Sequence, residues 1–249
     1  MRKTVVGVAV TLVGLTVGAC GSSSTATPTA HVGDLAGKTP AQVLSAAVAA
    51  ARAQRTAHYV MTAHNGGQTQ TISGDAGPSE GQQTVKQGTQ QIKVVYVASV
   101  AYVQGNAGGL SSVMGLKAAT ANTFAGKWIA IHKTDGGLYS SIAQSVTLVS
   151  TLTQLEPSGN LTLTGLATVA GRQVIGVRGG LPGQAQSGVT GSATYFIATT
   201  HPTLPLRFSG QVKSGTQSAL DDGSFSKWGV PLHLSAPTTT VPFSSIPTS

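Results

Sequence analysis

The sequence predicts an α+β fold built on an antiparallel sheet, and three observations support this prediction. A helix-like segment comes first, many short segments of alternating residue type follow, and a helical insert divides those segments into two groups. Turn signals such as Asn65-Gly66-Gly67 separate neighbouring segments, which is typical of hairpins. Helices and strands that are segregated along a chain favour an α+β fold over one with alternating helices and parallel strands.

The first helix is expected to begin at Pro40 and to end near Arg55. Thr39 is a suitable N-cap residue, Pro40 suits the first helical position, and Gln42 can close a capping box with Thr39. Apolar and small side chains then follow at helical spacing, which allows close packing on a sheet; they are Val43, Leu44, Ala47, Val48 and Ala51.

Strands are expected from Thr56 onward, where the spacing of apolar residues changes to two. The turn at Ala98-Ser99 is unusual, because it lacks a glycine. The expected strands cover residues 58–64, 68–73, 82–87, 90–97, 100–104, 126–131, 161–169, 172–178, 193–198, 206–212 and 223–227, with room for one more over 230–235.

The insert between the two groups of strands is expected to be helical. Short helical stretches are predicted around Val113 and Ala118, and one longer helix is predicted from Tyr139 to Leu155, ending before Pro157. Apolar residues of the longer helix recur at steps of four and three and so share one face, namely Ile142, Val146, Val149, Leu152 and Leu155.

The N-terminus has the features of an export signal. Arg2 and Lys3 precede an apolar run from Val5 to Val17, which is shorter than the ~20 apolar residues that a membrane-spanning helix needs. The run ends in Val17-Gly18-Ala19-Cys20, which resembles the lipobox of bacterial lipoproteins. Residues 1–19 are therefore predicted to be a lipoprotein signal peptide that is removed before Cys20.

Cys20 is the only cysteine of the chain, so the chain cannot form an internal disulfide bond. We expect its thiol to carry lipid (diacylglycerol, with chains such as palmitate) and to hold the protein on the extracytoplasmic face of a cell membrane, within the cell envelope. Residues 20–38 are rich in Ser, Thr, Ala and Gly and are expected to form a flexible tether. The alternative is an ordinary secretory signal followed by an accidental cysteine.

The charged residues do not indicate a nucleic-acid partner. Without the signal peptide the chain has 13 basic and 7 acidic residues, and the basic ones are scattered rather than interleaved with aromatic residues. The excess of basic over acidic residues has two interpretations that remain open. It could give a mild attraction to anionic lipid headgroups, or it could only keep the surface solvated.

No catalytic or metal site and no cofactor are predicted. The chain has no phosphate-binding loop of the form G-x-x-x-x-G-K-S/T and no G-x-G-x-x-G motif, and its six histidines lack metal-ligand spacing. His58 and His64 share one strand face but lie about 20 Å apart, too far to bind the same ion. Asp221 and Asp222 precede Gly223 and are interpreted as a turn rather than a catalytic pair. The protein is therefore not expected to be an enzyme.

The order and spacing of several short motifs resemble one family. They are the leading helix, Tyr102-Val103-Gln104-Gly105, Gly126-Lys127-Trp128 with the helix after it, Ala193–Ala198, Leu204-Pro205-Leu206-Arg207 and Phe225–Gly229. This pattern resembles the LolA-like half-barrel family of actinobacterial lipoproteins, which includes LprG and LppX. The resemblance implies one domain over residues 39–236, in which helices pack on the concave face of a strongly curved antiparallel sheet. Residues 237–249 are expected to be an irregular tail.

The resemblance also implies an apolar space between sheet and helices that can hold the acyl chains of a lipid or glycolipid. The expected protein is a monomer that binds or transfers lipid. The alternative is a structural, protein-interaction or sensor lipoprotein of the same fold with a collapsed cavity. Eight residues are candidates for the wall of the cavity, although for each one plain core is the favoured interpretation, because a sheet–helix core would show the same pattern: Val60, Val94, Tyr102, Ile129, Ile142, Val146, Val149 and Phe196.

Overall fold

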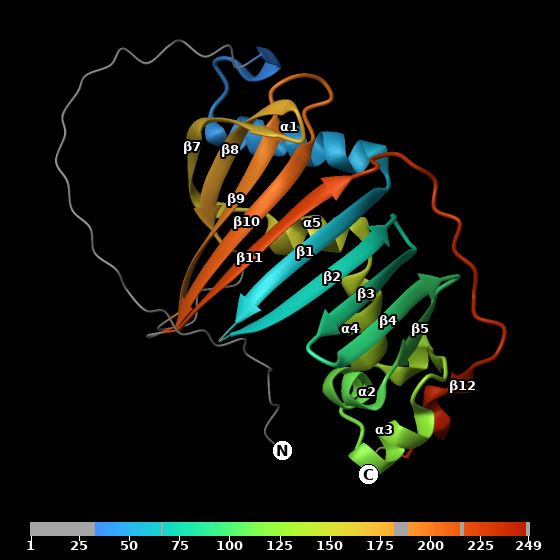
Figure 1. Cartoon of the computed structure of the whole chain (residues 1–249). Helices are drawn as coiled ribbons and strands as arrows, with labels where there is room; N and C mark the ends of the chain where they lie inside the picture. The colour runs from blue at the N-terminus through green and yellow to red at the C-terminus, as the bar shows by residue number, and fades with distance from the viewer. Residues whose placement is uncertain (1–32, 66, 182–188, 215–216, 248–249) are drawn as a thin grey trace.

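The computed structural model describes residues 33–65, 67–181, 189–214 and 217–247 (Figure 1). The predicted signal peptide, Cys20 and the tether up to residue 32 lie outside these residues.

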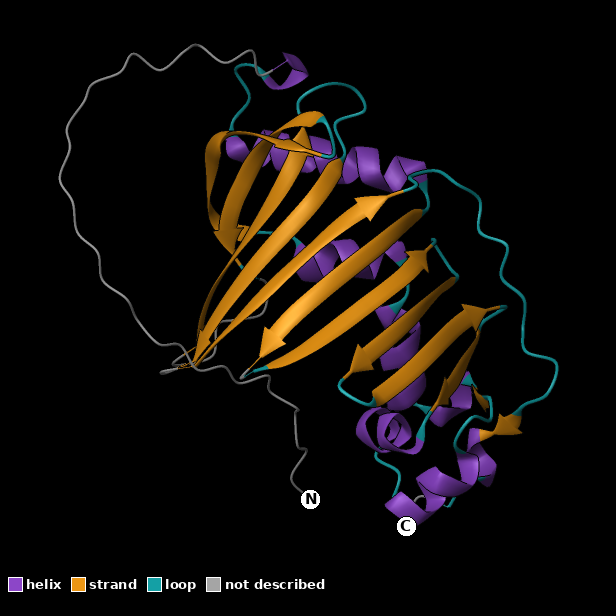
Figure 2. Cartoon of the chain, viewed as in Figure 1, coloured by secondary structure: helices purple, strands orange, loops and turns teal. Residues whose placement is uncertain are grey.

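One open sheet of twelve strands dominates the described chain, and all neighbouring strands are antiparallel except β12 and β6 (Figure 2). The spatial order is β12-β6-β5-β4-β3-β2-β1-β11-β10-β9-β8-β7. The strands are β1 (Ala57–Asn65), β2 (Gln68–Ala76), β3 (Gly81–Gln87), β4 (Gln90–Val97), β5 (Val100–Gly105), β6 (Ile129–Ile131), β7 (Ser158–Val169), β8 (Arg172–Gly180), β9 (Val189–Ala198), β10 (Pro205–Ser214), β11 (Gln217–Ser226) and β12 (Val241–Pro242).

The helices of the described chain pack against one face of the curved sheet, behind it in the view of Figure 2, so the predicted half-barrel fold is confirmed. We call this side the helix-covered face and the opposite side the outer face. The helices are α1 (Pro40–Gln54), α2 (Ala107–Met114), α3 (Ala118–Phe124), α4 (Gly137–Ser145) and α5 (Leu148–Leu155), with short 3-10 turns at Gly33–Leu35, Lys133–Asp135 and Phe243–Ser245.

Helix α1 begins and ends where the sequence predicts. The Thr39 hydroxyl accepts a hydrogen bond from the Gln42 backbone N–H at 3.3 Å, and the Gln42 side chain accepts one from the Thr39 N–H at 2.9 Å. This capping box satisfies two backbone donors that the first turn of a helix leaves free.

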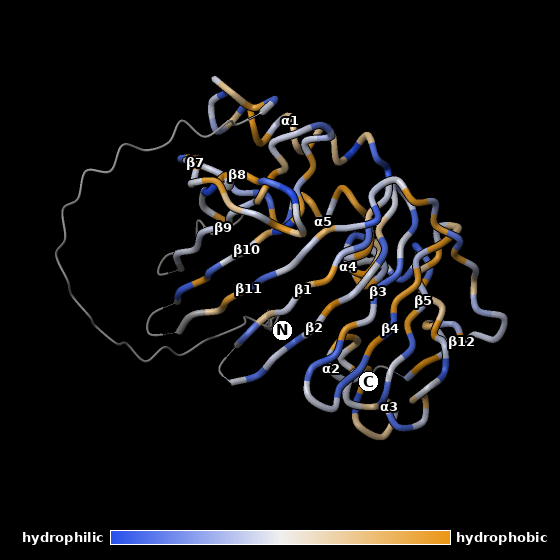
Figure 3. The backbone as a smooth tube through the Cα atoms, turned by 45° about the horizontal axis from the view of Figure 1, so that its top comes forward, coloured by the Kyte–Doolittle hydropathy of each residue, from blue (hydrophilic) through white to orange (hydrophobic). Residues whose placement is uncertain are grey.

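Side chains alternate between the two faces of the sheet, as strand geometry requires, and hydrophobic and hydrophilic stretches alternate along the strands in Figure 3. In β1, Tyr59 is 2% exposed beneath the helices, whereas its neighbour Val60 is 39% exposed on the outer face.

The helix-covered face carries two separate apolar clusters. The first lies between helices α1 and α5 and strands β1 and β8–β11, and its largest members are Tyr59, Tyr195, Phe208 and Phe225. The second lies between helices α2–α4 and strands β4–β6, and it includes Val94, Val103, Leu110, Ile129, Ile131, Ile142 and Val146.

The prediction of one helix from Tyr139 to Leu155 is wrong, because the chain breaks at Val146 and Thr147 into α4 and α5. The break lies against the β2–β3 turn. The Leu148 N–H donates to the Gly77 carbonyl oxygen at 2.9 Å, and Gly77 and Thr147 form a parallel bridge. Pairing with the sheet thus replaces helical hydrogen bonds at this point.

The C-terminal segment differs from its prediction in two respects. No strand forms over residues 230–235, and the expected irregular tail contributes β12 beside β6. The Val241 N–H donates to the Trp128 carbonyl oxygen at 2.8 Å, and Ile246 is 5% exposed in the second cluster. The segment therefore runs along the side of the sheet from β11 to the edge of β6 (Figure 1).

Replacement of Gly81 by alanine is expected to destabilise the fold by about 1–3 kcal/mol, because a Cβ there would overlap the Val146 carbonyl oxygen where the α4–α5 break meets the sheet. Gly165→Ala is the matched control, since a Cβ at Gly165 meets nothing within 4 Å and β7 should be unaffected or slightly stabilised. Urea unfolding measures both variants. Equal stability of the two would contradict the close contact at Gly81.

Candidate functional site

Bulky side chains fill the helix-covered face of the sheet along one row of paired residues. Phe208 and Tyr195 are directly paired across β10 and β9, and both are at most 2% exposed. The ring of Phe225 lies 5.5 Å from that of Phe208 and 6.4 Å from that of Tyr195, measured between centroids. The Tyr195 hydroxyl donates to the Leu152 carbonyl oxygen of α5 at 2.7 Å, which fixes α5 on this row.

The adjacent row on the same face has almost no side chains. Strands β1, β11, β10, β9 and β8 place five residues directly opposite one another, and four of the five are alanine or glycine. We call this row the small-residue strip; its members are Ala63, Asp221, Gly210, Ala193 and Gly179.

Half-buried apolar side chains surround the small-residue strip. Met61 of β1 lies in the row of Phe208 and Tyr195, next to the strip, and Leu155 is the last residue of α5. Leu161 of β7 lies over Gly179, where a Cβ would come within 2.6 Å of its Cδ2 atom. Each of these three residues packs against the first cluster but keeps part of its surface accessible. The strip thus has apolar borders that are less tightly packed than the core.

Asp221 is the one polar member of the strip. The prediction that Asp221 and Asp222 form a turn is wrong, because both lie within β11 and point to opposite faces. The Asp221 carboxylate lies across Gly210, with its Oδ2 atom 3.8 Å from the position of a Cβ there. Burial raises the pKa of Asp221 above its ordinary value, and the nearby charge of His64 offsets this in part.

A polar chain of hydrogen bonds separates this region from the second cluster. The Tyr59 hydroxyl donates to Gln83 Oε1 at 2.9 Å, and Gln83 Nε2 donates to Ser145 Oγ of α4 at 3.1 Å. Gly74 leaves room for the Tyr59 ring, since a Cβ there would lie 2.6 Å from the hydroxyl oxygen. Burial, together with the charge of Asp75, raises the pKa of Tyr59, so the hydroxyl stays a hydrogen-bond donor.

Four of the eight predicted wall residues lie in the second cluster. All four are at most 5% exposed and belong to the cluster beneath α2–α4, namely Val94, Ile129, Ile142 and Val146. They lie on the opposite side of the Tyr59–Gln83–Ser145 chain from the small-residue strip.

The other four predicted wall residues point away from the space between sheet and helices. Three of them lie on the outer face, because each is next to a buried, inward-facing residue of the same strand and side chains alternate along a strand. These three are Val60, Tyr102 and Phe196. Val149 is 47% exposed on α5. None of the eight belongs to the strip. Its residues gave no sequence signal of their own, because alanine and glycine are also common in turns, and only the register between strands shows that they form one row.

The described residues form neither a metal site nor a membrane-spanning helix. Among them, no group of three or more His, Cys, Asp and Glu side chains could hold a metal ion. His58 instead pairs with Asp75 at 2.7 Å. No helix within the described ranges is both long and apolar enough to cross a bilayer.

Solved structures of two mycobacterial lipoproteins are similar to this chain. LprF from Mycobacterium bovis aligns with a TM-score of 0.49 and 13% identity, over 80% of this chain and 96% of that one. LppX from Mycobacterium tuberculosis aligns with a TM-score of 0.49 and 17% identity, over 80% of this chain and all (100%) of that one. No protein-family model and no curated protein matches the sequence.

Asp221→Asn is expected to raise stability at pH 7 and to leave it unchanged near pH 3. Because the pKa of Asp221 is raised in the folded state, the folded protein binds its proton more tightly than the unfolded chain does. The stability that this proton contributes is present below the ordinary carboxyl pKa of about 4, and it is lost as the pH rises through the higher folded value. Urea unfolding midpoints at the two pH values provide the measurement.

Asp222→Asn is the matched control for this prediction. Asp222 accepts hydrogen bonds from Arg207 on the outer face, so its loss should lower stability at pH 7 slightly, by at most about 1 kcal/mol. If Asp221→Asn also lowered stability at pH 7, the Asp221 carboxylate would be stabilised in its ionised form, contrary to the burial described above.

Proposed function

We propose that this protein is a membrane-anchored, non-enzymatic lipoprotein that holds the acyl chains of a lipid or glycolipid on the helix-covered face of its sheet. The observation that carries the proposal is the small-residue strip. A row of alanine, glycine and one aspartate lies beside a row that holds buried aromatic residues, and half-buried apolar side chains lie around it. Such a surface offers an acyl chain apolar contact, and the bulky side chain that covers one end of it, Leu161 over Gly179, is half-buried and can move aside.

The dimensions of the strip suit an acyl chain. Its five strands span about 19 Å at the ordinary spacing of neighbouring strands. Each buried methylene contributes about 0.8 kcal/mol, so a 16-carbon chain would gain roughly 12 kcal/mol before the cost of ordering it is subtracted. Met61, Leu155 and Leu161 can adjust to the bound chain because part of their surface is still free.

Asp221 supplies a position for the polar group of the bound lipid. An acyl chain beside an ionised carboxylate would remove that charge from water without giving it a partner, which is costly. The polar group of the lipid therefore lies beside Asp221, and its acyl chains run along the strip toward Ala63 on one side and toward Gly179 on the other.

Cys20 supplies the anchor in this proposal. The motif Val17-Gly18-Ala19-Cys20 and the absence of any second cysteine support lipidation of that thiol on the extracytoplasmic side of a membrane. The residues between Cys20 and Gly33 would then keep the sheet close to the membrane that supplies its ligand.

A second candidate function is a structural, sensor or protein-interaction lipoprotein of the same fold without lipid cargo. One observation favours it: the second cluster, where half of the predicted wall residues lie, is packed as an ordinary core. The following experiment separates the two functions.

Ala63→Leu is expected to reduce lipid binding, because a larger side chain would occupy the β1 end of the small-residue strip. The measurement is native mass spectrometry of the full chain extracted gently from membranes, together with uptake of a fluorescent fatty acid. Wild-type protein should retain lipid and take up the probe, and the variant should lose most of both.

Thr62→Leu is the matched control, since the neighbouring residue on β1 faces the outer side and leaves the strip unchanged. Lipid carriage by wild type and both variants alike would rule out the strip as the binding surface. A wild-type protein that carries no lipid and takes up no probe would favour the second candidate function.

Cys20→Ser is expected to abolish incorporation of an alkyne-labelled palmitate and to move the protein from the membrane fraction into the soluble fraction of cells. Ser22→Ala, which leaves the lipobox motif intact, should change neither result. Continued labelling of the Cys20→Ser variant would show that the lipid is attached elsewhere or that the label is not covalent.

A further inference from the structure

The outer face of the sheet carries a groove of about 460 Å³ on the same strands as the small-residue strip, and two members of the strip, Gly210 and Asp221, also line it. Its floor consists of short polar side chains on β9 and β10, and longer side chains of β8, β10 and β11 stand around it. We call it the outer groove, and its lining includes Arg178, Thr194, Arg207, Ser209, Gln211 and Asp222.

Arg207 is held in one position at the edge of the outer groove. Its Nε donates to Asp222 Oδ1 at 2.9 Å, and one of its terminal N–H groups donates to the other oxygen of the same carboxylate. The Phe196 ring lies under the guanidinium, 5.1 Å from ring centroid to Cζ, on the neighbouring strand β9. The remaining N–H groups of Arg207 are therefore free to donate without further loss of side-chain freedom.

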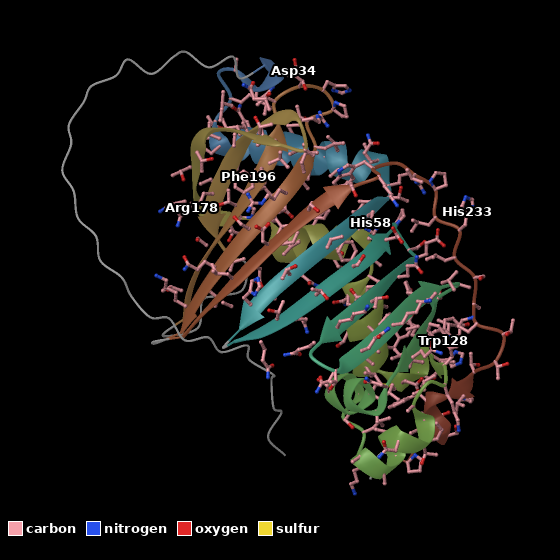
Figure 4. The ribbon with its side chains drawn as sticks, in the orientation of Figure 1. Asp34, His58, Trp128, Arg178, Phe196 and His233 are labelled. Carbon is pink, nitrogen blue, oxygen red and sulfur yellow. The ribbon has the colours of Figure 1, made fainter. Side chains whose placement is uncertain are left out.

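Arg178 provides an excess positive charge. It lies on β8, the strand that pairs with the strand of Phe196 (Figure 4), and its side chain donates to Ser192 Oγ at 3.4 Å. Among the described residues, no carboxylate lies within 4 Å of its guanidinium, whereas Arg207 is neutralised by Asp222. Arg178 on β8 and Asp222 on β11 are three strand spacings apart, about 14 Å.

The floor between these charged groups has unused hydrogen-bonding capacity. Ser209 and Thr194 are directly paired across β10 and β9, and Gln211 follows on the same face. The described residues provide no hydrogen-bond partner for the three side chains. Two hydroxyls and an amide thus face the groove as both donors and acceptors, between a free guanidinium and a carboxylate.

We propose that the outer groove binds a phosphorylated polyol, such as a sugar phosphate or the headgroup of a phosphoinositide. The single excess charge of Arg178 suits one phosphate group, which a guanidinium can bind through two hydrogen bonds. Hydroxyls of the ligand would pair with Asp222, the fixed N–H groups of Arg207 and the polar floor. Gly210 and Asp221 line both the groove and the acyl-binding strip, but the side chains proposed to contact the polyol phosphate lie on the opposite face of the strands from the strip.

Isothermal titration calorimetry of the full chain in detergent micelles tests this assignment, with glucose 6-phosphate, glucose and inorganic phosphate as probes. Glucose 6-phosphate should bind more tightly than either of the others, because only it carries both the phosphate and the hydroxyls. Arg178→Gln should weaken its binding about tenfold or more, as expected for loss of a charge-assisted hydrogen bond. Thr194→Val, which removes one hydroxyl with little change of shape, should weaken it about fivefold.

Lys86→Gln is the matched control, since it removes one positive charge from the outer face on β3, away from the groove. This variant should bind glucose 6-phosphate as wild type does. The proposal is overturned if glucose 6-phosphate does not bind, if Arg178→Gln and Lys86→Gln have equal effects, or if inorganic phosphate alone binds as tightly.

A second arm identifies the source of the ligand. Phosphatidylinositol is added to the detergent micelles, with phosphatidylcholine as the control lipid, and the titration with glucose 6-phosphate is repeated. Competition by phosphatidylinositol alone supports a lipid headgroup as the ligand. Unchanged binding of glucose 6-phosphate in both micelles supports a soluble sugar phosphate.

Discussion

The contact between the helical layer and the middle of the sheet is the constraint on which the rest of the structure depends. The chain between α4 and α5 breaks where the Val146 carbonyl oxygen lies over Gly81, and the Leu148 N–H bonds to the Gly77 carbonyl group. Only a residue without a side chain permits so close an approach. The break redirects the helical layer, so that α4 covers one end of the sheet and α5 the other.

This contact also explains why the helix-covered face has two regions of different character. On one side of the Tyr59–Gln83–Ser145 chain, helices α2–α4 pack closely on β4–β6 and leave a conventional core. On the other side, the sheet presents aromatic residues next to alanine and glycine. A fold of one sheet and one helical layer thus combines a closely packed half with a half that carries a row of small side chains. The outer face of the same strands carries the polar residues of the groove.

The sequence predicted the positions of most helices and strands, but it did not predict on which face of the sheet the candidate wall residues lie. The capping box at Thr39 and the alternating segments depend on residues close together in the chain, so helix α1 and most strands could be predicted. Whether Val60 or Phe196 faces the helices depends on the pairing of its strand, since a shift of the strand by one residue moves every side chain to the opposite face. Apolar residues on both faces of β1 and β9 left that choice undecided by sequence alone.

Two further differences between the predicted and the observed elements also come from contacts between residues far apart in the chain. The apolar stripe from Ile142 to Leu155 continued across the break, because the hydrogen bond that interrupts the helix comes from Gly77, about seventy residues earlier in the chain. Asp221 and Asp222 followed the usual composition of a turn, yet pairing with β1 and β10 holds them in a strand. In both cases a tertiary contact outweighs the local preference.

The central claim is that acyl chains bind on the small-residue strip and not in the second cluster. Nuclear magnetic resonance of the isotope-labelled protein with a spin-labelled stearate tests this most directly, because the label broadens signals of residues that lie near it. Binding on the strip should broaden the signals of Met61, Ala63 and Ala193 and leave those of Val94, Ile129 and Ile142 unchanged. Broadening of Val94, Ile129 and Ile142 instead, or of neither group, would contradict it.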